Sequence, residues 1–196
     1  MKEKLKKLTP NNFILDYWKD EIKKLEKKEI EINVADFDYT LFSRDEQLEK
    51  EQYLRENRGD LWPKAIAEIG WGINSYIEKY YLNKIFPTEI LEKFNKKYDL
   101  IITAWIYEFQ IAKLNASNLT DYNFVITKNW EEKIIELIRY IIYKLKFIPS
   151  KITVYEDRPQ YFIEYRDLIK DVLEVKLEIM YVEMDWNNGY KKIEKV

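Results

Sequence analysis

The sequence predicts a single α/β domain over residues 1–196, with a mostly parallel sheet and helices on both of its faces. Three observations carry this prediction. Apolar segments of strand length alternate with segments that have apolar residues at helical spacing, most clearly after residue 98. Hydrophobic residues make up 46% of the chain, which is enough for a sizeable core. Two of the predicted strands end in acidic residues, at the positions where sheets of this class bind ligands.

The first predicted element is an amphipathic helix at about 11–28, because Ile14, Trp18, Ile22 and Leu25 recur at helical spacing. A charged and then aromatic-rich stretch at about 43–97 predicts a small, cap-like helical insertion, with its last helix at 89–97. The other predicted elements are strands at 29–37, 98–104, 122–127, 151–156 and 175–184, helices at 106–115, 129–146 and 159–173, and a polar tail at 185–196.

The amino-acid composition excludes several classes of chemistry. The chain has no cysteine and no histidine, which removes thiolate zinc sites, cysteine nucleophiles, Ser-His-Asp triads and imidazole bases. Acid–base chemistry would fall to carboxylates, Lys or Tyr, and any metal would be a hard, oxygen-bound ion such as Mg²⁺. The formal net charge of −2 lacks the basic excess that is typical of nucleic-acid-binding proteins.

No apolar segment approaches the roughly 20 residues that cross a membrane, and no apolar region follows the charged N-terminus. These features favour a cytoplasmic protein that does not contact a membrane.

The strongest candidate site begins at Asp36, where an apolar strand ends in the segment DFDYTLF. Asp36 and Asp38 stand two residues apart, and Asp36 occupies the position where a ligand would bind in an α/β sheet. A second strand ends in Glu156 and Asp157. Acidic pairs of this kind also occur in ordinary solvated loops, so their order and their placement at strand ends are what favour a functional interpretation.

DFDYTLF resembles the first motif of the haloacid dehalogenase (HAD) superfamily, and YEDRPQYF is similar to a segment of the HAD domain in Swiss Army Knife RNA repair proteins. The resemblance covers roughly residues 30 to 165. It implies a Rossmann-like core and a phosphatase in which Asp36 attacks phosphorus and Asp38 is the general acid and base. It also implies a phosphorylated substrate, a nucleotide or a nucleic-acid end.

The same resemblance assigns the remaining roles. Thr103, at the end of a strand, would donate a hydrogen bond to a phosphate oxygen, and Lys128 would neutralise the charge of the nucleophile and phosphate, with Lys133 as its rival. One departure stands out, because Trp105 lies where many proteins of this kind have arginine after Thr-Gly. The implied Mg²⁺ ligands are Asp36, the backbone carbonyl of Asp38 and Asp157, while Glu156 would ligate directly, through water or not at all.

The sequence therefore predicts a Mg²⁺-dependent phosphomonoesterase that acts through an aspartyl-phosphate intermediate. The alternative is a catalytically weak module of the same fold that binds a partner or a phosphorylated ligand, which the unusual Trp105 favours.

Overall fold

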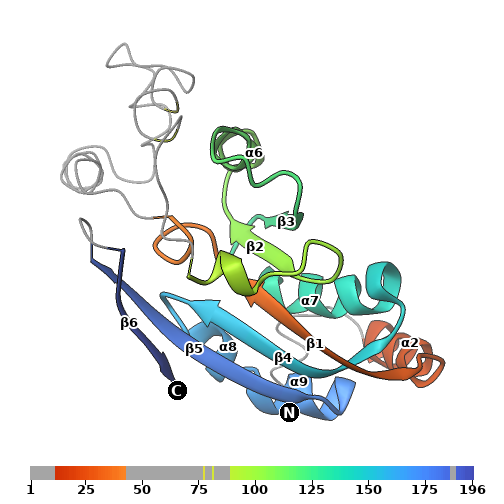
Figure 1. Cartoon of the computed structure of the whole chain (residues 1–196). Helices are drawn as coiled ribbons and strands as arrows, with labels where there is room; N and C mark the ends of the chain where they lie inside the picture. The colour runs from red at the N-terminus through yellow and green to blue at the C-terminus, as the bar shows by residue number, and fades with distance from the viewer. Residues whose placement is uncertain (1–11, 43–76, 78–80, 82–88, 186–188) are drawn as a thin grey trace.

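The computed structural model describes residues 12–42, 77, 81, 89–185 and 189–196, and a six-stranded sheet lies at its centre (Figure 1). The spatial order of the strands is β3-β2-β1-β4-β5-β6. The first five strands are parallel, and β6 is antiparallel to β5. The strands are β1 (Lys27–Ala35), β2 (Leu100–Ala104), β3 (Asn123–Thr127), β4 (Ile148–Glu156), β5 (Lys176–Asp185) and β6 (Gly189–Lys195). The predicted α/β class with a mostly parallel sheet is confirmed.

The strand order reverses between β1 and β4. The chain proceeds from β1 outward to β2 and β3, and then crosses to the other side of β1 to form β4. In open α/β sheets, ligands bind outside the carboxyl ends of the strands at such a reversal. Ala35 is in register with Tyr155, so the next residues, Asp36 and Glu156, lie side by side at the carboxyl ends of β1 and β4.

One face of the sheet is covered by several helices that share a single apolar core. Alternate strand residues such as Ile32, Val34 and Val154 point into this core and are fully buried. Opposite them lie apolar side chains of the helices, including Trp18 and Ile169. The helices are α2 (Asn12–Lys23), α7 (Glu132–Arg139), its π-helical continuation η3 (Tyr140–Leu145), α8 (Gln160–Ile163) and α9 (Arg166–Leu173).

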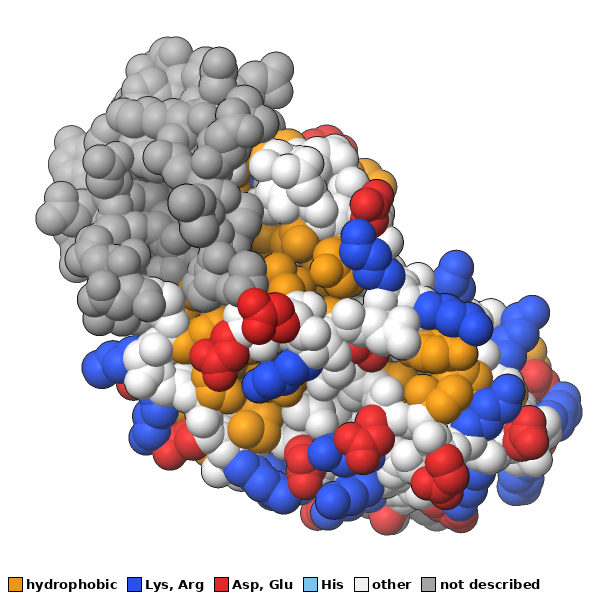
Figure 2. All heavy atoms as spheres, in the orientation of Figure 1, with side chains coloured by type: hydrophobic (Ala, Val, Ile, Leu, Met, Phe, Trp, Pro, Cys, Tyr) orange, Lys and Arg blue, Asp and Glu red, His pale blue; other side chains and the backbone are white. Residues whose placement is uncertain are grey.

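The opposite face carries α6 (Tyr107–Ala116) and the turn that follows β1. Phe109 and Leu114 of α6 are buried there beside Ile101 of the sheet. Nearer the amino ends of the strands the same face is charged. Lys151 pairs with Glu31 at 3.3 Å and with Glu178 at 3.0 Å, and Figure 2 shows acidic and basic side chains interspersed over this surface.

The helices differ from their predicted bounds. The first helix ends at Lys23 rather than near residue 28, because a turn at 24–26 leads into β1. The predicted helix at 129–146 begins at Glu132 and continues as a π-helix from Tyr140. The predicted helix at 159–173 is two helices, and the predicted helix at 89–97 is only a 3-10 turn, η2 (Leu91–Lys93). Most of the predicted insertion at 43–97 lies outside the described residues.

The predicted polar tail contains a strand. In β6, Tyr190 pairs with Met184 while Lys192 pairs with Glu183, so β6 has one extra residue between them. This bulge turns Tyr190 and Ile193, which are three residues apart, toward the same apolar core. A strict period of two would have placed them on opposite faces.

None of the helices in the described ranges combines the length and the apolar character needed to cross a membrane.

Candidate functional site

A tight turn holds the segment after β1 against the sheet. Phe37 is fully buried, and its carbonyl accepts hydrogen bonds from the N–H groups of Leu41 and Phe42, each at 3.0 Å. The rings of Phe37 and Phe42 are parallel, with centroids 5.8 Å apart. The Oγ1 of buried Thr40 accepts a hydrogen bond from the N–H of Asp157 at 3.1 Å, which ties this turn to the end of β4. The two acidic segments are therefore fixed relative to each other.

Lys133 reaches the same place from the first turn of α7. The N–H of Glu132 donates to Asn129 Oδ1, and the Glu132 carboxylate accepts a hydrogen bond from the N–H of Lys128 at 2.9 Å. This reciprocal arrangement resembles a capping box and determines where the helix starts. The N–H of Lys133 bonds to the carbonyl of Trp130, and its side chain is directed into the protein, where it is fully buried.

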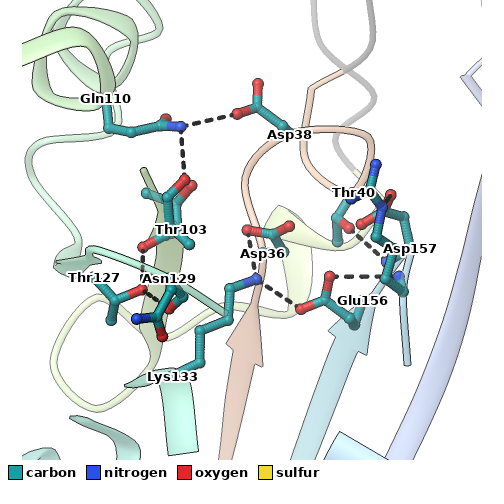
Figure 3. A network of polar contacts seen from close by, with 12 residues as sticks. Asp36, Asp38, Thr40, Thr103, Gln110, Thr127, Asn129, Lys133, Glu156 and Asp157 are labelled. Atoms are coloured by element: carbon teal, nitrogen blue, oxygen red, sulfur yellow. Dashed lines mark hydrogen bonds and ion pairs between the residues drawn. The ribbon is translucent and has the colours of Figure 1, made fainter. Parts of the chain in front are cut away.

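The buried ammonium of Lys133 bridges two carboxylates (Figure 3). Its Nζ lies 3.0 Å from Asp36 Oδ1 and 2.8 Å from Glu156 Oε2. Asp157 completes the group, since one carboxylate oxygen from each of Asp36, Glu156 and Asp157 lies within 4.8 Å of the others. If all three acids are ionised, three negative charges face one buried positive charge, and the excess is two.

Burial explains the electrostatics of the acids. It raises the pKa of Asp36 to about 8, with the charge of Glu156 adding to the effect and Lys133 opposing it. Burial likewise raises the pKa of Glu156 to about 7, against the influence of Lys133. The pKa of Asp157 is raised to about 6 by burial and then by the charge of Asp36. Burial alone would lower the pKa of Lys133, but Asp36 and Glu156 outweigh it and raise this pKa.

Asp38 points away from these acids toward α6, where two buried side chains hold it. Lys113 Nζ lies 2.7 and 3.0 Å from the two carboxylate oxygens of Asp38, and Gln110 Nε2 donates to one of them at 3.2 Å. Sequence reasoning missed both residues. The available signal was their spacing along the helix. Lys113 lies four residues after buried Phe109 and three residues after Gln110, on the apolar side of α6.

Lys128 is not part of the group. Its side chain is exposed, and the structure places Lys133 beside Asp36, not Lys128 as the sequence had favoured. The reason is the start of α7. Lys133, in the first turn of this helix, lies at the carboxyl ends of the strands, whereas Lys128, directly after β3, does not contact Asp36. Thr103 is buried at the end of β2, and its backbone carbonyl accepts a hydrogen bond from Thr127 Oγ1 at 3.3 Å.

Trp105 adopts an unusual backbone conformation at the end of β2. Its φ of 133° is costly for a bulky residue, and such strain concentrates at functional sites. A hydrogen bond from its N–H to the carbonyl of Thr127 at 2.8 Å helps to hold it, and its ring meets Phe109 edge-on at 5.6 Å. The half-buried Trp105 side chain is therefore packed against α6.

The three acids suit a hard divalent cation. Carboxylate oxygens are the ligands that Mg²⁺ prefers, and the excess of two negative charges matches its charge. A bound cation would also remove the electrostatic cost that keeps the pKa values of these acids high. Within the described residues, Asp36, Glu156 and Asp157 form the group of acids that can hold an ion, and the backbone carbonyl of Asp38 follows on the same turn.

Comparisons of the chain with protein-family models, with curated proteins and with solved structures found no match. The chemistry of the site is therefore inferred from its own residues and geometry.

Proposed function

We propose that the chain is a Mg²⁺-dependent phosphomonoesterase of the HAD type, with Asp36 as its nucleophile. The observation that carries the proposal is the contact of Lys133 with Asp36 at 3.0 Å, beside two further acids, at the point where the strand order reverses. A carboxylate attacks a phosphoryl group only when the negative charges of both are compensated. A buried ammonium and a divalent cation provide that compensation.

The reaction has two steps. In the first, a carboxylate oxygen of Asp36 forms a bond to phosphorus, the bond from phosphorus to the leaving-group oxygen breaks, and that oxygen takes a proton from Asp38. In the second, water attacks the phosphorus of the aspartyl phosphate, Asp38 takes the proton, and phosphate leaves with Asp36 regenerated. The ion pair with Lys113 favours ionised Asp38, which suits the second step, in which Asp38 acts as a base.

Asp36, Asp157, Glu156 and the carbonyl of Asp38 would hold the cation. When bound, it supplies positive charge to the phosphoryl oxygens. Lys133 keeps the Asp36 carboxylate oriented. Because the Lys133 side chain is fully buried, it also excludes water from the buried side of Asp36. Thr40 fixes Asp157 through the 3.1 Å hydrogen bond, so the ligands from β1 and β4 remain in register.

The experiment is the release of phosphate from a panel of monoesters with Mg²⁺, covering sugar phosphates, nucleotides and 3′- or 5′-phosphorylated oligonucleotides. We expect release that requires Mg²⁺ and disappears in Asp36→Asn, while Asp20→Asn, an exposed aspartate on α2, keeps full activity. Release that persists in Asp36→Asn would show that Asp36 is not the nucleophile.

A second candidate is a binding module of the same fold with little turnover. Asp38 favours it, because Lys113 and Gln110 stabilise the ionised carboxylate, which then takes up a proton less readily and so holds one less often for the leaving group. Such a module would bind phosphate or a phosphate ester in the presence of Mg²⁺ without releasing phosphate from any substrate in the panel.

A further inference from the structure

A partly exposed aromatic and cationic cluster borders the acidic site. Its members are Trp130, on the loop between β3 and α7, Tyr161 of α8, and Arg158, which follows Asp157. The rings of Trp130 and Tyr161 are parallel within 3°, with centroids 5.7 Å apart, and the Arg158 guanidinium carbon lies 5.7 Å from the Trp130 centroid. We call these three side chains the ring cluster.

Both ends of the ring cluster are joined to the candidate site. The carbonyl of Trp130 accepts the hydrogen bond from the N–H of Lys133 at 3.1 Å. Arg158 Nε lies 3.6 Å from a carboxylate oxygen of Asp157. When the phosphoryl group of a substrate reaches Asp36, the leaving group of that substrate would therefore lie beside the ring cluster.

Much of the Trp130 ring remains uncovered. Parallel rings in contact are about 3.5 Å apart, so a centroid separation of 5.7 Å means that the two rings are displaced sideways and overlap only in part. The exposed fractions agree, at 43% for Trp130 and 39% for the Arg158 side chain. Cation–π contacts at such exposed positions contribute little to stability, so a purely structural role explains the ring cluster poorly.

We propose that the ring cluster binds a planar aromatic ring on the leaving group of the substrate, which is the chemistry of a nucleobase. The inference rests on the proposed phosphatase function and specifies its substrate. An indole and a guanidinium both stack on the flat face of a nucleobase, so they accept any of the bases regardless of the hydrogen-bonding groups on its edge. The formal net charge of −2 lacks the basic excess that binds a polynucleotide backbone, so the occupant is a single nucleotide, free or at the end of a strand.

The test compares two substrates that differ only in the base. The ratio of kcat/KM for AMP to kcat/KM for ribose 5-phosphate is measured for the wild type, Trp130→Ala and Trp130→Phe. We expect a wild-type ratio well above one that falls about tenfold or more in Trp130→Ala and is largely retained in Trp130→Phe. Tyr143→Ala, which removes an aromatic ring of similar exposure on η3, should leave the ratio unchanged.

Two outcomes would overturn the proposal. One is a wild-type ratio near one. The other is a Trp130→Ala variant in which both substrates lose activity equally, which would make the ring cluster a structural support. If the wild type releases no phosphate at all, the phosphatase proposal fails, and dissociation constants of AMP and ribose 5-phosphate for Asp36→Asn then test the ring cluster separately. Equal constants would refute it. A parallel arm with a 5′-phosphorylated oligonucleotide distinguishes a strand end from a free nucleotide.

Discussion

Replacing Lys133 with methionine removes one buried positive charge and leaves two buried carboxyl groups, of Asp36 and Glu156, without their shared partner. Methionine has a similar length, so a cavity contributes little to the effect. Removing one member of a buried ion pair typically costs about 3–5 kcal/mol. Lys133 is fully buried and contacts Asp36 at 3.0 Å and Glu156 at 2.8 Å, so we expect a loss in that range for the free energy of unfolding at pH 8.

The loss should depend on pH in a definite direction. The pKa values of Asp36 and Glu156 are already raised, to about 8 and about 7, and without Lys133 they rise further. Between about pH 5 and pH 8 the unfolded chain has these carboxyls ionised while the folded variant keeps their protons. The unfolded state then binds fewer protons, and the free energy of unfolding of the variant falls as pH rises, by up to about 1.4 kcal/mol per pH unit for each carboxyl. The wild type behaves alike below about pH 7, so the loss grows mainly above that pH, where Glu156 and then Asp36 of the wild type release their protons.

The assay is urea denaturation of the wild type, Lys133→Met and Lys128→Met at pH 5.5 and pH 8. Lys128 is exposed, so Lys128→Met should stay within about 0.5 kcal/mol of the wild type at both values of pH. The reasoning is refuted if Lys133→Met is as stable as the wild type at pH 8, if its loss does not grow with pH, or if both lysine variants behave alike.

Three further predictions concern the same site. Mg²⁺ should raise the Tm of the wild type more at pH 8 than at pH 6, because the acids must lose protons to bind it, and Asp157→Asn should abolish the shift in calorimetry. Asp38→Asn should lower the free energy of unfolding by about 2–4 kcal/mol in urea, because it removes the negative charge 2.7 Å from the buried Lys113 ammonium, and no loss would contradict this. Thr40→Val should lower the free energy of unfolding by about 1–2 kcal/mol and weaken Mg²⁺ binding in titration calorimetry, because the N–H of Asp157 loses its acceptor. Unchanged Mg²⁺ affinity would show that Thr40 does not position Asp157 for the cation.

The acidic part of the site was predictable because it depends on strand order and strand ends. Two strands that each end in acids must bring those acids to one edge when the strands are parallel neighbours, as β1 and β4 are. Asp36, Glu156 and Asp157 meet for this reason. The apolar strand before each acid carries the signal, and burial of parallel strands makes such segments easy to recognise.

The basic part was harder to predict because it depends on helix phase. Lys133 is buried in the first turn of α7, which begins at Glu132, so the start of this helix and not the end of β3 determines which lysine reaches Asp36. Lys113 lies within the apolar stripe of α6, where a lysine normally signals a solvent-facing position. The π-helix at Tyr140 and the bulge in β6 are further shifts of phase that a fixed period of 3.6 or 2 does not describe.

The central claim is that Asp36 becomes phosphorylated during turnover. The most direct measurement is to mix the protein with Mg²⁺ and a substrate from the active panel, quench it with acid within milliseconds to seconds, and locate any phosphoryl group by peptide mass spectrometry. We predict one phosphoryl group on the peptide that contains Asp36, absent from Asp36→Asn and from a sample without Mg²⁺. Turnover of the same substrate without a phosphorylated peptide, or with the phosphoryl group on another residue, would contradict the claim.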